Sequence, residues 1–175
     1  MKKPHANASA LLLDIVNAMP CGGKFDLPKG VRLLDAGNGK YRVTASMNSY
    51  SVESEAHTSF AQALLSFLTA WAKEVPGMAW PNEEAEPSLL DEQLQAAVQM
   101  HSKYRLNDGD AIDLSRYHDD NGKETGLYQM VSMASDPTGL TESDRCPQIL
   151  SRPQPTIEAC VAEYMNALRK VFPLG

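Results

Sequence analysis

Two stretches of the chain share one pattern of apolar positions. The first, SFAQALLSFLTAWAKEVP, covers residues 59–76, and the second, TIEACVAEYMNALRKVFP, covers residues 156–173. Aligned without a gap, apolar residues match apolar residues along nearly the whole length, and each stretch ends in a proline. Apolar residues spaced three and four apart predict an amphipathic helix. We therefore expect two similar helices, one near the middle of the chain and one near its C-terminus.

A strand pattern precedes each of these helices. In residues 30–47, polar and apolar positions alternate around Asn38-Gly39, a dipeptide typical of a tight hairpin turn. Residues 111–133 repeat this arrangement around Asn121-Gly122, and an alternating segment at 50–55 indicates a third strand in the first half. Hairpins of this kind bury one face and leave the other in water. The side chains expected on the wet face include Arg42, Thr44, Gln129 and Ser132.

A helix is also expected ahead of each hairpin. Helical spacing marks residues 9–19, with Asn7 or Ser9 as N-cap, and another run begins after Ser88. Each half then consists of a helix, a hairpin and a closing helix, and both turns contain Asn-Gly-Lys. We predict an α+β fold of two degenerate copies of a helix–antiparallel hairpin (two or three strands)–helix unit, with the helices on one face of the sheet. The alternative is a chance likeness between two amphipathic helices.

The predicted boundaries place the first unit at residues 1–76 and the second at 88–175. The segment between them, 77–87, contains prolines and acidic residues and is expected to be a linker. Only the second unit carries a long loop, predicted at 134–155. Since loops of this length are often functional, deletion of 136–152 is expected to leave the fold intact and remove partner binding. The sequence leaves open whether the units join edge to edge into one sheet or pack through their helices.

Composition and charge narrow the function classes. The chain has 175 residues, is 43% hydrophobic and carries a formal net charge of −6, as expected for an acidic folded domain. An acidic balance disfavours general binding to nucleic acid. The apolar runs are shorter than the roughly 20 residues that span a bilayer, so we expect no membrane insertion. The N-terminal apolar stretch is too short and too polar for an export signal, and a cytoplasmic location is predicted.

Few side chains point to catalysis or to a metal. Cys21, in PCGGK, could act as a thiolate nucleophile beside Lys24, but the same residues suit a turn that ends a helix. Carboxylates gather at 107–113 and 118–122, where they could hold a divalent cation, although Asp and Asn at this density are typical of turns. Cys160 lies on an apolar stripe and is expected in the core. We predict no catalytic residue, no metal site and no cofactor.

The order of helix, strands and closing helix is similar to the topology of double-stranded RNA-binding domains. That family places lysines at the start of its last helix, where they clamp phosphates. The corresponding positions here are HTSF (57–60) and QPTI (154–157), which contain no lysine. The resemblance therefore implies shape and not RNA binding. Residues 41–68 also resemble the strand-strand-helix antitoxins that neutralise small RNases, but without the acidic-Gly motif of that family.

These features predict a non-enzymatic protein-binding protein of bacterial or phage type, such as an inhibitor, an immunity protein or an adaptor. The acidic surface favours a basic protein as its partner, and a homodimer is compatible with the same features. The residues expected to contact the partner lie in the linker and in the long loop and are Trp80, Glu83, Glu84, Asp136, Glu142, Asp144 and Arg145.

Two alternatives stay open. One is an enzyme of an unrecognised type. The other is a nucleic-acid-binding protein that uses a local basic patch on the topology described above. The residues available for such a patch are Arg32, Lys40, Arg42, Lys123, Arg145, Arg152, Arg169 and Lys170.

Overall fold

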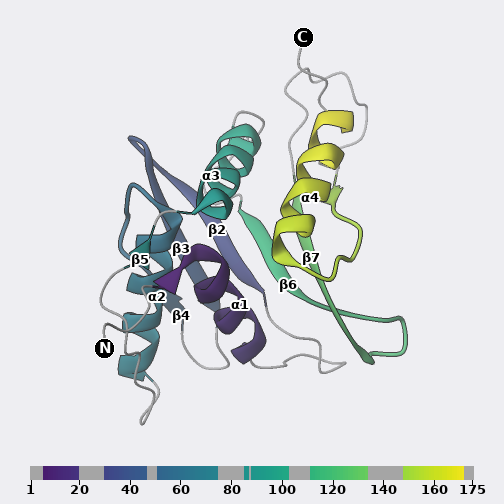
Figure 1. Ribbon diagram of the computed structural model, residues 1–175, viewed down its shortest axis with the longest axis horizontal. Helices are drawn as coiled ribbons and strands as arrows, with labels where there is room; N and C mark the ends of the chain where they lie inside the picture. The colour runs from purple at the N-terminus through teal and green to yellow at the C-terminus, as the bar shows by residue number, and fades with distance from the viewer. Residues whose placement is uncertain are drawn as a thin grey trace.

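The computed structural model describes residues 6–19, 30–46, 51–74, 85–86, 88–102, 111–133 and 148–171. The first half contains α1 (Ala8–Ala18), β2 (Val31–Gly37), β3 (Lys40–Ser46), β4 (Ser51–Glu53) and α2 (Phe60–Glu74). The second half contains α3 (Leu89–Ser102), β6 (Ile112–His118), β7 (Glu124–Met133), β8 (Gln148–Leu150) and α4 (Ile157–Val171). Two short parallel strands, β1 (Ala6–Asn7) and β5 (Ala85–Glu86), pair just before α1 and α3 (Figure 1).

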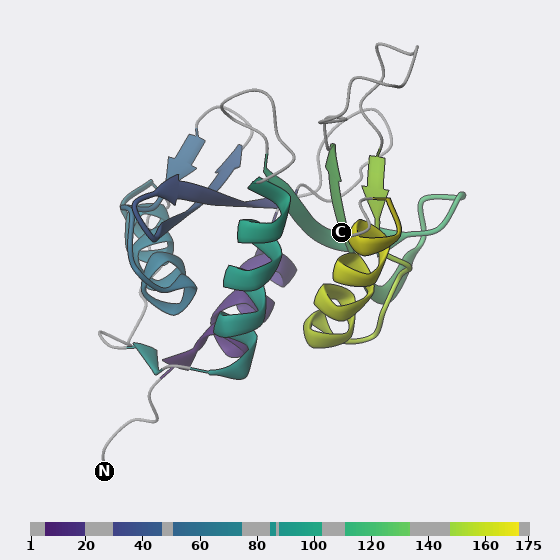
Figure 2. The same cartoon turned by 90° about the horizontal axis from the view of Figure 1, so that it is seen from above.

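The other six strands form one antiparallel sheet in the order β4-β3-β2-β6-β7-β8. The halves meet where β2 pairs with β6, with Leu33 opposite Ile112 and Val31 opposite Leu114. The two hairpins thus join edge to edge, which protects the edge that each would otherwise expose. All four helices lie on one side of this sheet (Figure 2). The described fold is therefore α+β, with two layers, and the predicted fold class is confirmed at that level.

Local chemistry explains where the helices and the first turn form. The side-chain oxygens of Asn7, Ser59 and Thr156 each accept a hydrogen bond from the backbone N–H three residues later, at 2.9, 3.2 and 3.2 Å. These bonds satisfy N–H groups that have no partner within the helix. In the first hairpin, Asn38 and Gly39 have φ angles of 55° and 70°. Two consecutive positive φ values are the reason for Asn-Gly at this turn.

The second hairpin turn is organised by Asp119. Its carboxylate accepts hydrogen bonds from the backbone N–H groups of Asn121 and Lys123, both at 2.9 Å. Its backbone carbonyl accepts from Gly122 N–H, also at 2.9 Å, and Gly122 has a φ of 77°. This is the backbone-bonding role of Asp in a turn. The turn interpretation of residues 118–122 is confirmed.

The core lies between the sheet and the helices. Along β3, Tyr41, Val43 and Ala45 are buried beneath the helices, whereas Arg42 and Thr44 alternate with them on the opposite face. This alternation is the period of two that the sequence pattern predicted. The closing helices bury their apolar stripes against the same layer, which accounts for the matching patterns at 59–76 and 156–173. Among the described residues, no helix is long and apolar enough to cross a membrane.

The expectation for Ser132 is wrong. Gln129 of β7 projects from the face opposite the helices, since it pairs with Ser115 and is partly exposed. Residues three positions apart on a regular strand lie on opposite faces. Ser132 therefore faces the helices, where it is 2% exposed and its hydroxyl hydrogen-bonds to the hydroxyl of Tyr164 at 2.6 Å.

The second half has a third strand, which the predicted unit of two or three strands allows, but it lies in a segment that was predicted to be a loop. β8 lies within the predicted loop 134–155 and pairs with β7, and Gln154 forms a further bridge to Tyr128. Ile149 of β8 is 1% exposed. A deletion of 136–152 would remove this strand and its buried side chain, so the expectation that it leaves the fold intact is wrong. Of the predicted loop, residues 134–147 lie outside the described residues.

Two hydrogen bonds at equivalent places link the halves to each other. Gln99 of α3 donates to the hydroxyl of Tyr41 in β3. The hydroxyl of Tyr128 in β7 bonds to Asn17 of α1 at 3.0 Å. In each case the middle strand of one half is tied to the first helix of the other. The two halves therefore share one core and are expected to unfold together.

Candidate functional site

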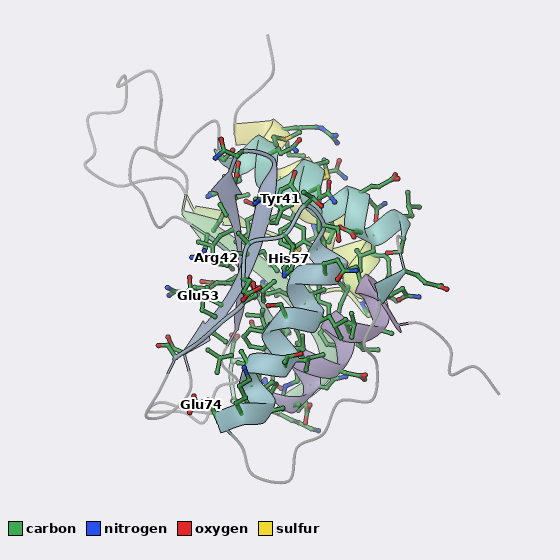
Figure 3. The ribbon with its side chains drawn as sticks, turned by 90° about the vertical axis from the view of Figure 1, so that its left-hand side faces the viewer. Tyr41, Arg42, Glu53, His57 and Glu74 are labelled. Carbon is green, nitrogen blue, oxygen red and sulfur yellow. The ribbon has the colours of Figure 1, made fainter. Side chains whose placement is uncertain are left out.

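The sheet face opposite the helices carries two ion pairs between neighbouring strands. Arg42 of β3 contacts Glu53 of β4 at 2.5 Å, and Arg32 of β2 contacts Asp113 of β6 at 3.2 Å. Figure 3 shows Arg42 and Glu53 on the side of the sheet away from the helices. The four side chains are 40% to 57% exposed, so solvent weakens both pairs. The two arginines are thus matched by two carboxylates on this face.

Two shallow depressions on this face share Arg32. One, of about 250 Å³, extends along β2 and β3, and the other, of about 360 Å³, lies over β2, β6 and β7. Burial raises the pKa of Asp113, and the nearby Arg32 guanidinium opposes that shift only in part. Because charges of both signs alternate here, the depressions have no marked preference for an anion or a cation.

A third cavity lies at the outer edge of the second half, between β8 and α4. We call it the β8–α4 groove. Its volume is about 470 Å³. Residues from the edge strand and from the outer flank of the helix line it, and these are Leu150, Arg152, Glu163, Asn166, Ala167, Arg169 and Lys170.

The β8–α4 groove is a locally cationic site on an acidic protein. Among the described residues that line it, Arg152, Arg169 and Lys170 are positively charged and Glu163 is negatively charged. Arg152 is 81% exposed and lies 4.0 Å from Glu163, at the outer limit of an ion pair. Such a contact restrains the guanidinium weakly, so Arg152 remains available to another carboxylate.

A hydrogen bond joins the corresponding positions in the first half. There Glu55, two residues beyond β4, donates its backbone N–H to the hydroxyl of Ser66 in α2 at 2.9 Å. Arg152 stands two residues beyond β8, and Glu163 occupies the position in α4 that Ser66 occupies in α2. These positions are thus joined by a hydrogen bond in one half, whereas in the other half they line a groove.

The edge strand directs backbone groups into this groove. Ser151 N–H donates to the carbonyl of Met130 in β7 at 2.9 Å, and Leu150 stands opposite Val131. Backbone groups of successive residues in a strand point in opposite directions. The N–H and C=O of Leu150 therefore point away from β7, to the side of β8 on which the described part of the chain places no further strand. The Leu150 side chain is 46% exposed.

The sequence-predicted partner contacts are not among these groups. The linker and loop residues named for this role all lie outside the described residues, and these are Trp80, Glu83, Glu84, Asp136, Glu142, Asp144 and Arg145. Their role stays a prediction. Cys21 and Cys146 also lie outside the described part.

The structure brings together only part of the candidate basic patch. Arg32 and Arg42 lie on the sheet face in their ion pairs, and Lys40 and Lys123 stand at the two hairpin turns. The remaining described members, Arg152, Arg169 and Lys170, meet in the β8–α4 groove. A single basic surface through all these residues is therefore not present among the described ones.

Negative groups occupy the start of both closing helices. The carboxylate of Asp91 in α3 accepts hydrogen bonds from the N–H groups of Phe60 and Ala61 in α2, at 2.8 and 3.2 Å. In the first turn of α4, Glu158 accepts a 2.5 Å hydrogen bond from Ser9 of α1. Helix N-termini attract anions, but here protein carboxylates already lie at them. This arrangement disfavours the phosphate contacts that double-stranded RNA-binding domains make at this position.

A chain of polar groups crosses the core of the second half. The Tyr164 hydroxyl bonds to Ser132 at 2.6 Å and to Nδ1 of His101 at 3.2 Å. These side chains are 0%, 2% and 2% exposed. Burial raises the pKa of Tyr164, so its hydroxyl stays protonated at neutral pH. Because the groups lie inside the core, we assign them to the packing of the second half and not to a reaction.

Cys160 is a buried core thiol, as predicted. It is 0% exposed, and its sulfur lies 3.3 Å from the hydroxyl of Ser151. Burial raises the pKa of the thiol, which lowers the reactivity of the group. Among the described residues, no three His, Cys, Asp or Glu side chains gather as a set that could hold a metal ion.

Sequence reasoning missed the β8–α4 groove because it missed β8. The sequence offers Arg152, Arg169 and Lys170 only as possible members of a basic patch. Nothing in the sequence between these positions relates them to each other. A comparison of the two halves held one usable signal, since the segment Ile149–Arg152 precedes α4 as Val52–Glu55 precedes α2.

Comparisons with protein-family models, with curated proteins and with solved structures found no match to this chain.

Proposed function

We propose that the protein is a non-enzymatic protein-binding protein of bacterial or phage type, acting as an inhibitor, immunity protein or adaptor. The observation that carries this proposal is the β8–α4 groove, where an exposed edge strand lies beside a cationic helix flank. Edge strands and adjacent grooves are a recurrent means of recognising other polypeptides. The titratable groups of the second-half core, His101, Tyr164 and Cys160, are buried and offer no access to a substrate.

The net charge also favours a protein partner. At −6, the molecule as a whole repels phosphate backbones and attracts basic proteins, although the groove itself is cationic. The carboxylates of Asp91 and Glu158, which lie at the first turns of α2 and α4, add to the repulsion of phosphate. We therefore favour protein binding over nucleic-acid binding as the function.

The test uses the full-length protein as immobilised bait in a lysate of the bacterium that carries its gene. A captured protein is identified, purified and titrated against the bait by calorimetry. We expect saturable binding with a fixed stoichiometry. A matched pair of variants, Arg169→Glu/Lys170→Glu and Lys40→Glu/Lys123→Glu, makes the same change in net charge inside and outside the groove. If no protein binds with defined stoichiometry, the proposed function is wrong.

We also infer that the halves are degenerate copies of one ancestral unit. Support comes from the reciprocal bonds of Tyr41 and Tyr128, each to the first helix of the other half. The repeated order of a helix, three strands and a helix supports it as well. In this view the first-half counterparts of Ser132 and Tyr164 are Ala45 and Phe67, which are buried at the same places in β3 and α2.

A double-mutant cycle in the first half tests the inferred duplication. Ala45→Ser and Phe67→Tyr each bury a hydroxyl that has no hydrogen-bond partner. Each should therefore lower the free energy of unfolding by about 1–3 kcal/mol. In the double variant the two hydroxyls can bond as Ser132 and Tyr164 do. We therefore expect the double variant to lose at least about 1 kcal/mol less than the sum of the single losses. Additive losses in urea unfolding would show that the positions do not correspond.

A further inference from the structure

We propose that the β8–α4 groove binds an extended acidic segment of the partner, which adds to β8 as a seventh strand of the sheet. This inference rests on the protein-binding function proposed above and names the chemistry of the bound segment. It has three supports, which are the direction of the edge backbone groups, the charge of the helix flank and the difference between the two halves.

The backbone of β8 fits an added strand. The N–H and C=O of Leu150 point to the free edge, and its side chain is 46% exposed. A polypeptide placed about 4.8 Å from β8 would bond to these groups as in any sheet. Main-chain bonds of this kind need an extended peptide, and a nucleic acid cannot form them.

The charges of the groove select the side chains of that peptide. Alternate residues of the added strand would point towards α4, where Arg169 and Lys170 are exposed in its last turn. Arg152 lies at the end of β8, only weakly held by Glu163 at 4.0 Å. Among the described lining residues, three cations opposite one carboxylate favour acidic residues at every second position.

The overall net charge of −6 does not prevent this contact. Screening at physiological salt limits electrostatic interactions to about 8 Å, so the charges inside the groove decide the local preference. The first half provides the comparison, because there the Glu55–Ser66 hydrogen bond already occupies the equivalent positions. We therefore expect one such segment per molecule.

The experiment measures fluorescence anisotropy with a labelled ten-residue peptide of alternating valine and glutamate. A peptide of alternating valine and lysine and a labelled 16-base-pair RNA duplex are the matched probes. The protein is used at full length as wild type, Arg169→Glu/Lys170→Glu, Lys40→Glu/Lys123→Glu and Leu150→Pro. The proline variant removes the outward N–H at an edge position, where proline is tolerated. Circular dichroism confirms that each variant is folded.

We expect saturable 1:1 binding of the valine–glutamate peptide to the wild type and to Lys40→Glu/Lys123→Glu with equal affinity. Arg169→Glu/Lys170→Glu should weaken binding at least tenfold and Leu150→Pro at least threefold, while the lysine peptide should not bind. The inference is overturned if the groove variant binds as well as the wild type, if the lysine peptide binds equally, or if the RNA binds more tightly than the acidic peptide. Absence of peptide binding at millimolar protein also overturns it.

Failure of this inference is distinguishable from failure of the proposed function. A captured partner that binds the wild type and the groove variant equally would retain the protein-binding function but place its contact elsewhere. A partner that loses affinity only for Arg169→Glu/Lys170→Glu would support both.

Discussion

Ser132 and Tyr164 are expected to be energetically coupled, so that removing both hydroxyls costs less than the sum of the two single losses. The two oxygens are 2.6 Å apart, and the side chains are 2% and 0% exposed. Tyr164→Phe removes the hydroxyl that bonds both Ser132 and His101. These two buried side chains then lose that hydrogen bond. Leaving a buried polar group unsatisfied costs about 1–3 kcal/mol, so we expect a loss of about 2–3 kcal/mol for this variant.

Ser132→Ala should cost less, about 1 kcal/mol, because the Tyr164 hydroxyl keeps His101 as a partner at 3.2 Å. The double variant removes both hydroxyls and recreates the pair Ala45 and Phe67 of the first half. Because the serine is then no longer left unsatisfied, the loss should be about 2 kcal/mol, smaller than the sum of the single losses by about 1–2 kcal/mol. Against a total stability of about 5–15 kcal/mol, each variant should remain folded at 25 °C.

The assay is urea unfolding of the full-length protein, followed by far-ultraviolet circular dichroism at pH 7. With a slope of about 2 kcal/mol/M, a loss of about 2 kcal/mol lowers the midpoint by about 1 M. The slope itself should not change, since the fold is retained. The reasoning is refuted if Tyr164→Phe costs less than about 0.5 kcal/mol or if the two losses are additive within that margin.

Three further predictions concern Asp91, Asp113 and Cys160. Asp91→Ala should cost about 2–3 kcal/mol in urea unfolding, because the first-turn N–H groups of α2 lose the carboxylate that accepts their hydrogen bonds. Asp91→Asn should cost less, and equal losses would contradict the capping role. Burial raises the pKa of Asp113 above its usual 3.8, so ionisation of this group favours the unfolded chain as the pH rises. Asp113→Asn should therefore raise the melting temperature relative to wild type at pH 7.5, and the gain should disappear near pH 3; a gain of the same size at both pH values would refute this sign. Cys160 should resist iodoacetamide at pH 8 in the folded protein and react after urea unfolding, as followed by peptide mass spectrometry, and rapid labelling of the native protein would contradict its burial.

The elements with strong local periodicity could be predicted from sequence. The stripe of α2 repeats over four turns, and Asn38-Gly39 requires a conformation that few other dipeptides adopt, as its φ angles of 55° and 70° show. Such signals lie within a few residues of each other. They therefore predict the helices and hairpins without knowledge of the contacts between distant segments.

The parts that depend on distant contacts could not be predicted. β8 is three residues long and becomes a strand by pairing with β7, so its own pattern is too short to show it. The groove follows from that pairing and could not be seen without it. The placement of Ser132 was a different error, because strict alternation from Gln129 already puts it on the buried face.

The pairing of β2 with β6 joins two halves of one polypeptide in one continuous sheet. In a symmetric homodimer of a single unit, every substitution would appear twice, and a groove opened in one subunit would open in the other. Here Ser66 bonds to Glu55 in the first half, while Glu163 at the matching position of the second half lines a groove. The second half is then free to evolve a contact surface at the β8–α4 groove, while the equivalent place in the first half keeps its hydrogen bond.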